Sequence, residues 1–135
     1  MKKAVLFLTL AEVIEIHNNQ IEIYGGRKGL RDITLLSSAL SMAETTFEGK
    51  YLHTDLFSMA AAYIFHICQN HPFVDGNKRV ALVTGLVFLD FNGIILTDPN
   101  EELYTMMMKV AKGKENKEFI SNILRKLSEC IIKNK

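Results

Sequence analysis

Several features that would point to common protein classes are missing from this sequence. The 135-residue chain has no tryptophan, only two prolines and two cysteines, and 16 basic against 15 acidic residues. Cys68 and Cys130 lie far apart and fit no metal-ligand spacing, so we interpret both as buried thiols in a reducing compartment. The near-zero net charge argues against a nucleic-acid-binding surface. Function should therefore reside in a local site.

No apolar run is long enough to cross a bilayer. The longest apolar stretches are interrupted by Ser58, His66 and Thr84, well short of the roughly 20 residues a membrane helix needs. The N-terminal residues 1–10 faintly imitate a signal peptide, but the apolar part ends early and no cleavage site follows. We expect a cytoplasmic protein that makes no membrane contact.

The hydrophobic pattern predicts an all-α fold within a single domain, residues 1–135. With 48% hydrophobic and 23% charged residues, the composition is close to globular averages. Six helices are expected, over about 10–23, 32–43, 54–70, 77–91, 99–113 and 116–132. The third and fourth are apolar on every face, which is typical of buried helices. The pattern indicates a helical bundle around a buried helical hairpin.

Local signals mark the ends of these elements. Thr9 and Glu12 form a capping-box pair, and Asp98-Pro99 predicts a cap followed by proline at the first helical position. Residues 7–9 could form a short strand. Residues 44–53 have no helical period and should form a loop or a β-hairpin.

The turn between the two buried helices concentrates polar chemistry. It reads His71-Pro72-Phe73-Val74-Asp75-Gly76-Asn77-Lys78-Arg79. Free N–H groups at the start of a helix form an anion hole, and Gly76 allows an oxygen to approach the backbone closely. Asn77 and Arg79 add donors, Asp75 offers a carboxylate for Mg²⁺, and His71 supplies an imidazole, the side chain that most often acts as a general base. The same residues could serve only to turn the chain and cap helices.

These nine residues resemble the signature of the Fic/Doc (death-on-curing) family, His-Pro-Phe-x-Asp/Glu-Gly-Asn-x-Arg. A chance match at seven positions is on the order of 10⁻⁹ per window. The resemblance extends less specifically through Tyr24-Gly25-Gly26 and the Gly29–Asp32 turn. It implies an enzyme that transfers part of ATP, with Mg²⁺, to a protein hydroxyl.

The resemblance also implies a role for each residue of the turn. His71 would deprotonate the target hydroxyl, Asp75 would hold Mg²⁺, and Phe73 would fix the loop from the core. The phosphate-binding residues would be Gly76, Asn77, Lys78 and Arg79. The flap that holds the target in this family maps to residues 44–53.

Lys78 separates two chemistries. Members that transfer AMP carry glycine at this position, whereas lysine resembles the Doc branch, in which the γ-phosphoryl group faces the acceptor. The resemblance thus favours a Doc-like toxin that phosphorylates a serine or threonine of a host protein, with elongation factor Tu as the family's best-known target. A Fic-type AMP transferase and a catalytically silent interaction module of this fold remain open alternatives.

The sequence lacks the inhibitory motif of many Fic proteins, Ser/Thr-x-x-x-Glu-Gly/Asn. The Glu-Gly/Asn pairs are Glu48-Gly49 and Glu115-Asn116, and Glu44 and Ala111 stand four residues earlier. We therefore expect an external inhibitor, an antitoxin whose disordered tail folds on binding.

Other polar and sulfur-containing residues receive structural interpretations. His66 is expected to be a satisfied core histidine, and His17 and His53 to be exposed. Residues 106–108, three methionines, are expected to fill gaps in the core. The basic turn of residues 27–31 is left outside the site.

Overall fold

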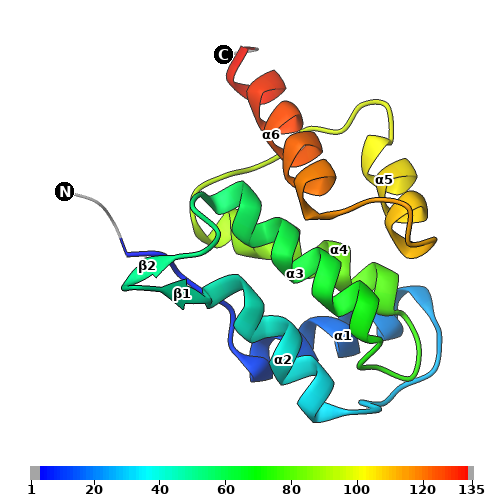
Figure 1. Cartoon of the computed structure of the whole chain (residues 1–135). Helices are drawn as coiled ribbons and strands as arrows, with labels where there is room; N and C mark the ends of the chain where they lie inside the picture. The colour runs from blue at the N-terminus through cyan, green and yellow to red at the C-terminus, as the bar shows by residue number, and fades with distance from the viewer. Residues whose placement is uncertain (1–3, 134–135) are drawn as a thin grey trace.

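The computed structural model describes residues 4–133, with side chains described as far as Ser128; the prediction for the Cys130 thiol lies outside the described residues. Six helices and one small hairpin make up the described chain (Figure 1). The elements are α1 (Leu10–Tyr24), α2 (Ile33–Glu44), β1 (Thr46–Phe47), β2 (Lys50–Tyr51), α3 (Leu56–Asn70), α4 (Asn77–Phe91), α5 (Glu102–Ala111) and α6 (Lys117–Lys133). The predicted all-α class is confirmed.

Helix α3 is the centre of the bundle and packs against α4, α2 and α6. A Cβ at Gly85 of α4 would lie 2.6 Å from Ile64 of α3, so glycine is what allows these two helices to approach closely. Helix α4 is less enclosed than predicted. Its α3-facing side is buried, whereas Val83 and Val87 on the other side are partly exposed and line a shallow pocket beside α1.

Side-chain caps fix the starts of the first three helices. Thr9 and Glu12 form the predicted capping box, and the carboxylates of Asp32 and Asp55 accept N–H groups of the first turns of α2 and α3. Helix α5 begins later than predicted, at Glu102. The Asp98 carboxylate still accepts the N–H groups of Glu102 and Leu103, so it caps the helix across the intervening residues.

The predicted strand at residues 7–9 is wrong. This segment is extended, but no neighbouring strand pairs with it among the described residues. Side chains bond the backbone here instead: the Tyr63 hydroxyl accepts the N–H of Leu8, and just before the segment the Asn92 amide bonds both backbone groups of Leu6.

The β1–β2 hairpin confirms the expected turn at residues 44–53 but corrects its proposed role. Glu48 and Gly49 have positive φ angles of 53° and 79°, as a tight two-residue hairpin turn requires. The hairpin precedes α3, whereas His71 follows it, and a 15-residue helix spans about 22 Å. Figure 1 shows the hairpin and the loop between α3 and α4 at opposite ends of α3. The prediction of residues 44–53 as a flap over the site is therefore wrong.

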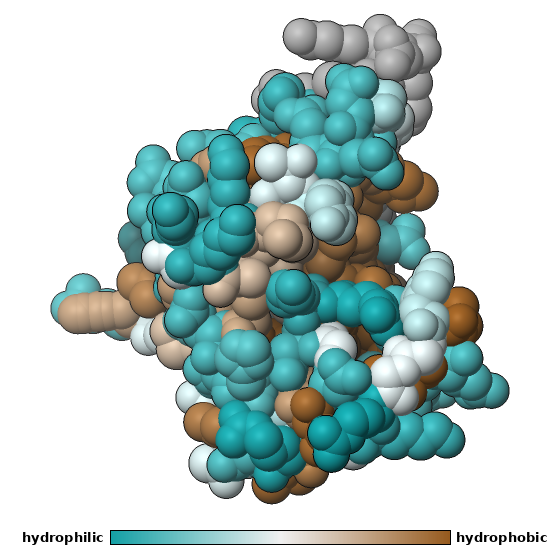
Figure 2. Space-filling model, turned by 90° about the vertical axis from the view of Figure 1, so that its right-hand side faces the viewer, coloured by the Kyte–Doolittle hydropathy of each residue, from teal (hydrophilic) through white to brown (hydrophobic). Residues whose placement is uncertain are grey.

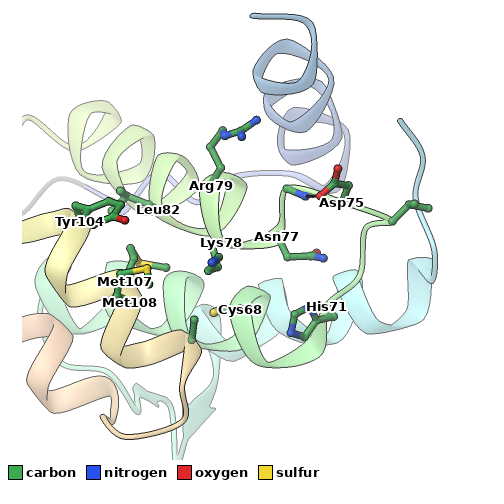
Figure 3. Close-up of a pocket in the computed structure, with 13 residues that line it drawn as sticks. Cys68, His71, Asp75, Asn77, Lys78, Arg79, Leu82, Tyr104, Met107 and Met108 are labelled. Atoms are coloured by element: carbon green, nitrogen blue, oxygen red, sulfur yellow. Dashed lines mark hydrogen bonds between the residues drawn. The ribbon is translucent and has the colours of Figure 1, made fainter. Parts of the chain in front are cut away.

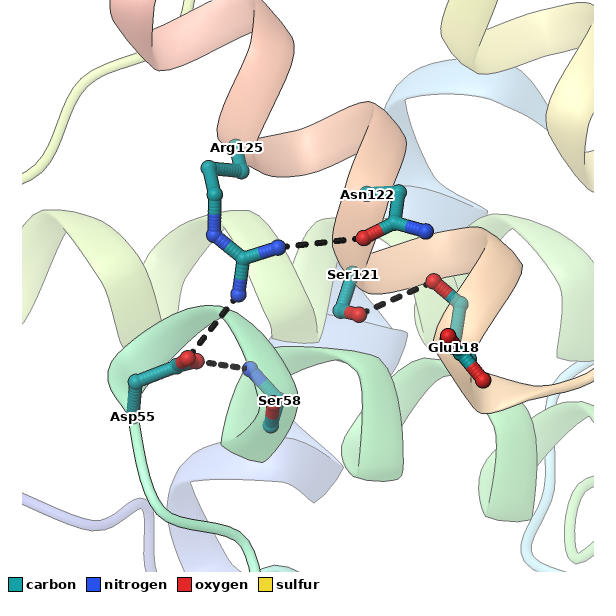
Figure 4. A network of polar contacts seen from close by, with 6 residues as sticks. All are labelled: Asp55, Ser58, Glu118, Ser121, Asn122 and Arg125. Carbon is teal, nitrogen blue, oxygen red and sulfur yellow. Dashed lines mark hydrogen bonds and ion pairs between the residues drawn. The ribbon is translucent and has the colours of Figure 1, made fainter.

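Polar contacts attach α6 to α3 at two places. Arg125 of α6 donates to the Asp55 carboxylate at 2.9 Å and so joins α6 to the N-terminus of α3 (Figure 4). Within α6, Asn122 accepts a second bond from the same guanidinium at 3.1 Å. Further along, Lys117 Nζ lies 3.2 Å from Nε2 of His66. His66 is thus satisfied as predicted, although it is only partly buried. His53 is also partly buried rather than exposed, with Nε2 enclosed.

Among the described residues, no helix is both long and apolar enough to cross a membrane.

Candidate active site

The turn between α3 and α4 is a short loop with left-handed residues at both ends. His71 caps α3 with φ 47° and ψ 55°, and Gly76 precedes α4 with φ 75°. These two left-handed residues turn the chain at either end of a six-residue loop, and the His71 side chain is exposed. The imidazole makes no hydrogen bond to another described residue, so it is free to meet a substrate.

The segment between α1 and α2 lies along this loop and fixes it. Leu30 and Phe73 form an isolated antiparallel bridge, and the N–H of Arg31 donates to the Pro72 carbonyl at 2.8 Å. The guanidinium of Arg31 donates to the His71 carbonyl through Nε at 2.9 Å and through Nη2. A cation at this position satisfies the carbonyl end of α3 and complements its dipole. Residues 27–31, which the sequence analysis leaves outside the site, therefore hold the backbone of its loop.

Asp75 is oriented by backbone groups from both sides. Its carboxylate accepts the N–H of Arg27 at 2.9 Å and that of Gly76 at 2.8 Å. These bonds, followed by the charges of Arg79 and Arg27, lower the pKa of Asp75 below its usual value. A Cβ at Gly26 would lie 3.0 Å from the carboxylate, so glycine is needed there. Asp75 is exposed and ionised at neutral pH.

His17 supports the loop from beneath, contrary to the prediction that it is exposed. Its side chain is 1% exposed, and its ring stacks on Phe73 with 3.9 Å between centroids and 8° between planes. Nε2 lies 2.8 Å from the Asp75 carbonyl oxygen and must carry the proton, because a carbonyl only accepts. The only sequence signal was its register on α1 with Val13 and Ile21, both buried.

Asn77 holds the loop closed. Its Oδ1 accepts the Phe73 N–H and its Nδ2 donates to the Phe73 carbonyl, both at 3.0 Å, and the residue is buried. With its amide engaged in this way, Asn77 can offer a ligand its backbone N–H. Sequence reasoning had expected the side chain to be a donor and missed this role.

The N-terminus of α4 is open. No side chain of the described residues caps it, so its first N–H groups stay available to an anion. Lys78 is exposed and lies at the middle of the adjoining cavity (Figure 3). A fixed charge beside free N–H groups suits a phosphate chain.

Arg79 points away from Lys78, towards the end of α1 (Figure 3). Its Nη1 donates to the Gly25 carbonyl at 3.1 Å, and its guanidinium lies 5.4 Å from the centre of the Tyr24 ring. Nε and Nη2 make no hydrogen bond to another described residue, so part of the guanidinium stays available.

The predicted residues line one cavity of about 760 Å³. His71, Asp75, Gly76, Asn77, Lys78 and Arg79 all contribute to it. The opposite wall comes from α5, with Tyr104, Met107, Met108 and Ala111, together with Leu82 and Cys68. Figure 2 shows apolar surface in the middle of the face at this end of the molecule, bordered by hydrophilic residues.

The contribution of α5 to the wall of this cavity was not predicted from the sequence. Cys68 is buried as predicted, and burial raises the pKa of its thiol. Met106 fills the core as predicted, whereas Met107 and Met108 also face the cavity. The signal was the spacing of residues 104, 107, 108 and 111, which share one helical face.

Asp75 suits a magnesium ion that arrives with a nucleotide. No cluster of three metal-ligating side chains exists among the described residues. Mg²⁺ ordinarily takes one or two carboxylates plus phosphates and water, so a single oriented, ionised carboxylate beside an anion hole fits that mode.

Comparisons with known proteins give a matching family model and two relatives. The family model described as the Fic/DOC family matches residues 7–89. A protein named Protein kinase doc, from Escherichia phage P1, is 31% identical over 116 residues, covering 86% of this chain and 90% of that protein. Toxin Doc of Mycolicibacterium smegmatis is 37% identical over 73 residues, covering 54% of this chain and 56% of that protein.

Proposed function

This chain belongs to the Fic/DOC family, and from that premise we propose that it is a Doc-like toxin that transfers the γ-phosphoryl group of ATP to a serine or threonine hydroxyl of a host protein. The name of the Mycolicibacterium smegmatis relative, Toxin Doc, supports a toxin, and the name of the phage protein, Protein kinase doc, supports a kinase. Elongation factor Tu is the target that the family resemblance implies.

The position of Lys78 carries the choice of phosphotransfer. Lys78 lies between the apolar α5 wall and the polar loop of His71 and Asp75 (Figure 3). A nucleotide with its base on the wall extends its phosphates past Lys78, so the terminal phosphate is the one that reaches His71. A nucleotide bound in the reverse orientation would present its α-phosphate to His71. Its β- and γ-phosphates would then have to lie where the Lys78 side chain is.

The reaction requires one proton acceptor and stabilisation of phosphate charge. His71 takes the proton of the target hydroxyl, whose oxygen bonds to the γ-phosphorus as the bond to the bridging β–γ oxygen breaks and ADP leaves. The N–H groups of Asn77 and Lys78, with the Lys78 ammonium and the free donors of Arg79, stabilise the phosphate oxygens. Mg²⁺ bound at Asp75 would neutralise the β- and γ-oxygens.

Regulation follows from the toxin assignment. The relatives imply an antitoxin partner, and the sequence lacks an internal inhibitory motif. The proposed inhibitor is a separate protein whose disordered tail folds on the toxin.

Isotopic labelling of ATP tests the proposal. Purified protein, Mg²⁺ and elongation factor Tu are incubated in parallel with ATP labelled at the γ- or the α-phosphate. Label from the γ position alone should enter the target, and His71→Asn should stop this. Transfer of α label would instead identify an AMP transferase. Absence of transfer despite nucleotide binding, repeated with a lysate of the host as acceptor, would favour the silent interaction module.

A further inference from the structure

One face of α5 forms an apolar wall of the cavity. Tyr104, Met107, Met108 and Ala111 stand at i, i+3, i+4 and i+7, so they share one side of the helix. We call these four residues the α5 wall. The remaining apolar side of α5, including Met106 and Val110, is buried in the core. The wall is thus held rigidly behind the cavity.

Tyr104 is the exposed part of the wall. Its side chain is 68% exposed although it lines the cavity, so much of its ring can be covered by a ligand. Met107 lies below it and is 6% exposed, and Met108 is partly buried. Polarisable sulfur atoms beside an aromatic ring suit a flat, aromatic ligand.

The side of the cavity formed by α5 has few groups that could hydrogen-bond the edge of a nucleobase. Along the wall the described side chains carry neither charge nor amide, and the one hydrogen-bonding group is the Tyr104 hydroxyl. Leu82 is apolar, and burial keeps the Cys68 thiol neutral by raising its pKa. At the end of the helix, the carbonyls of Met108 and Val110 already accept the N–H groups of Lys112 and Gly113.

We infer that the α5 wall holds the nucleobase by stacking and apolar contact alone, and that the enzyme therefore accepts GTP nearly as well as ATP. This inference rests on the proposed function, because it takes the triphosphate to lie at the loop of residues 71–79. A pocket that hydrogen-bonds one base edge rejects analogues strongly, whereas an apolar pocket discriminates weakly. Stacking tolerates every base, since each has a π-face.

Calorimetric titration of the purified chain with three magnesium complexes tests the inference. The ligands are ATP, GTP and inorganic tripolyphosphate. ATP and GTP should bind within about tenfold of each other, and both more tightly than tripolyphosphate. Tyr104→Ala should weaken both nucleotides by roughly 5- to 150-fold and leave tripolyphosphate affinity unchanged. Tyr104→Phe should restore most of the loss, because the ring remains.

Two exposed positions provide controls. Thr105→Ala lies on α5 outside the wall, and Phe47→Ala removes an exposed aromatic ring from the distant hairpin; neither should change nucleotide affinity. Preference for ATP over GTP by a hundredfold or more would overturn base indifference. Equal affinity for ATP and tripolyphosphate would overturn the wall as a base site while leaving the proposed function intact. Failure of all three ligands to bind would count against the proposed function itself.

Discussion

The ring of His17 stacks on the ring of Phe73 with 3.9 Å between their centroids, and its Nε2 donates to the Asp75 carbonyl 2.8 Å away. One buried side chain of α1 therefore supports both the apolar anchor of the loop and the residue proposed to hold Mg²⁺. The geometry of the loop depends on a residue 54 positions before its first member, His71.

Replacing His17 should damage both the fold and the site. His17→Phe keeps a ring against Phe73 but leaves the partly buried Asp75 carbonyl without its donor. We expect the free energy of unfolding to fall by about 1–3 kcal/mol, measured by urea denaturation. Asn18→Ala, at an exposed position on α1, is the matched control and should change little. An unchanged unfolding free energy in His17→Phe would show that the hydrogen bond contributes nothing.

His71 can be tested without straining the loop. Because its φ is 47°, asparagine is a better replacement than alanine, since asparagine tolerates the left-handed region. His71→Asn should lower phosphotransfer by roughly 10²–10⁴-fold while Mg-ATP affinity stays near that of the wild type. Transfer and calorimetric binding are measured on the same sample. A variant that modifies its target at the wild-type rate would exclude His71 as the base.

Asp75→Asn should uncouple nucleotide binding from magnesium. The substitution removes the carboxylate charge, so the gain in ATP affinity on adding Mg²⁺ should shrink strongly. Titrating ATP at several Mg²⁺ concentrations measures this gain, and circular dichroism checks that the loop change leaves the helices intact. The same Mg²⁺ dependence in variant and wild type would contradict the metal role.

Acid should destabilise the protein partly through His66. Burial, then the charges of Lys117 and His53, lower the pKa of His66 from 6.5 to about 4. Between these values the unfolded chain binds a proton that the folded chain does not, so stability falls as the pH drops from about 6.5 to about 4. The loss should be on the order of 1–2 kcal/mol after allowance for solvent screening.

Urea denaturation across this pH range measures the effect. His66→Gln should flatten the dependence between pH 6.5 and 4, whereas a variant at the exposed Asn18 should keep it. An identical slope in His66→Gln and the wild type would assign the acid sensitivity to other groups.

Local signals in the sequence predicted most of the helices. Capping side chains such as Thr9 and Asp55 act within one turn, so they can be read directly from their spacing. The nine-residue turn was likewise recognisable because its members are contiguous.

Long-range contacts account for what the sequence did not reveal. His17 and Arg31 bond the loop across 58 and 40 residues, and no local pattern indicates such partners. The pattern of residues 7–9 predicts a strand, yet the N–H of Leu8 bonds the Tyr63 hydroxyl, and the neighbouring Leu6 bonds the Asn92 amide instead of a second strand. The α5 wall was missed because three adjacent methionines are equally consistent with a core.

Two substitutions at Lys78 distinguish whether the charge or the volume of its side chain favours γ-phosphoryl transfer. Lys78→Gln keeps a side chain but removes the charge, and should lower phosphotransfer by roughly 10–100-fold without AMP transfer, as expected for one lost charge–phosphate contact of about 1.5–3 kcal/mol. Lys78→Gly also frees space and should allow weak AMP transfer in addition. AMP transfer by both variants, or by neither, would contradict a steric role for the side chain.

Intact-mass spectrometry of elongation factor Tu, after incubation with the wild-type protein, Mg²⁺ and ATP, tests the central claim most directly. The mass distinguishes an added phosphate from an added AMP without any assumption about rate. We expect a single added phosphate, which should be absent from the target after incubation with the His71→Asn control. An added AMP would contradict it and would identify the chain as an AMP transferase.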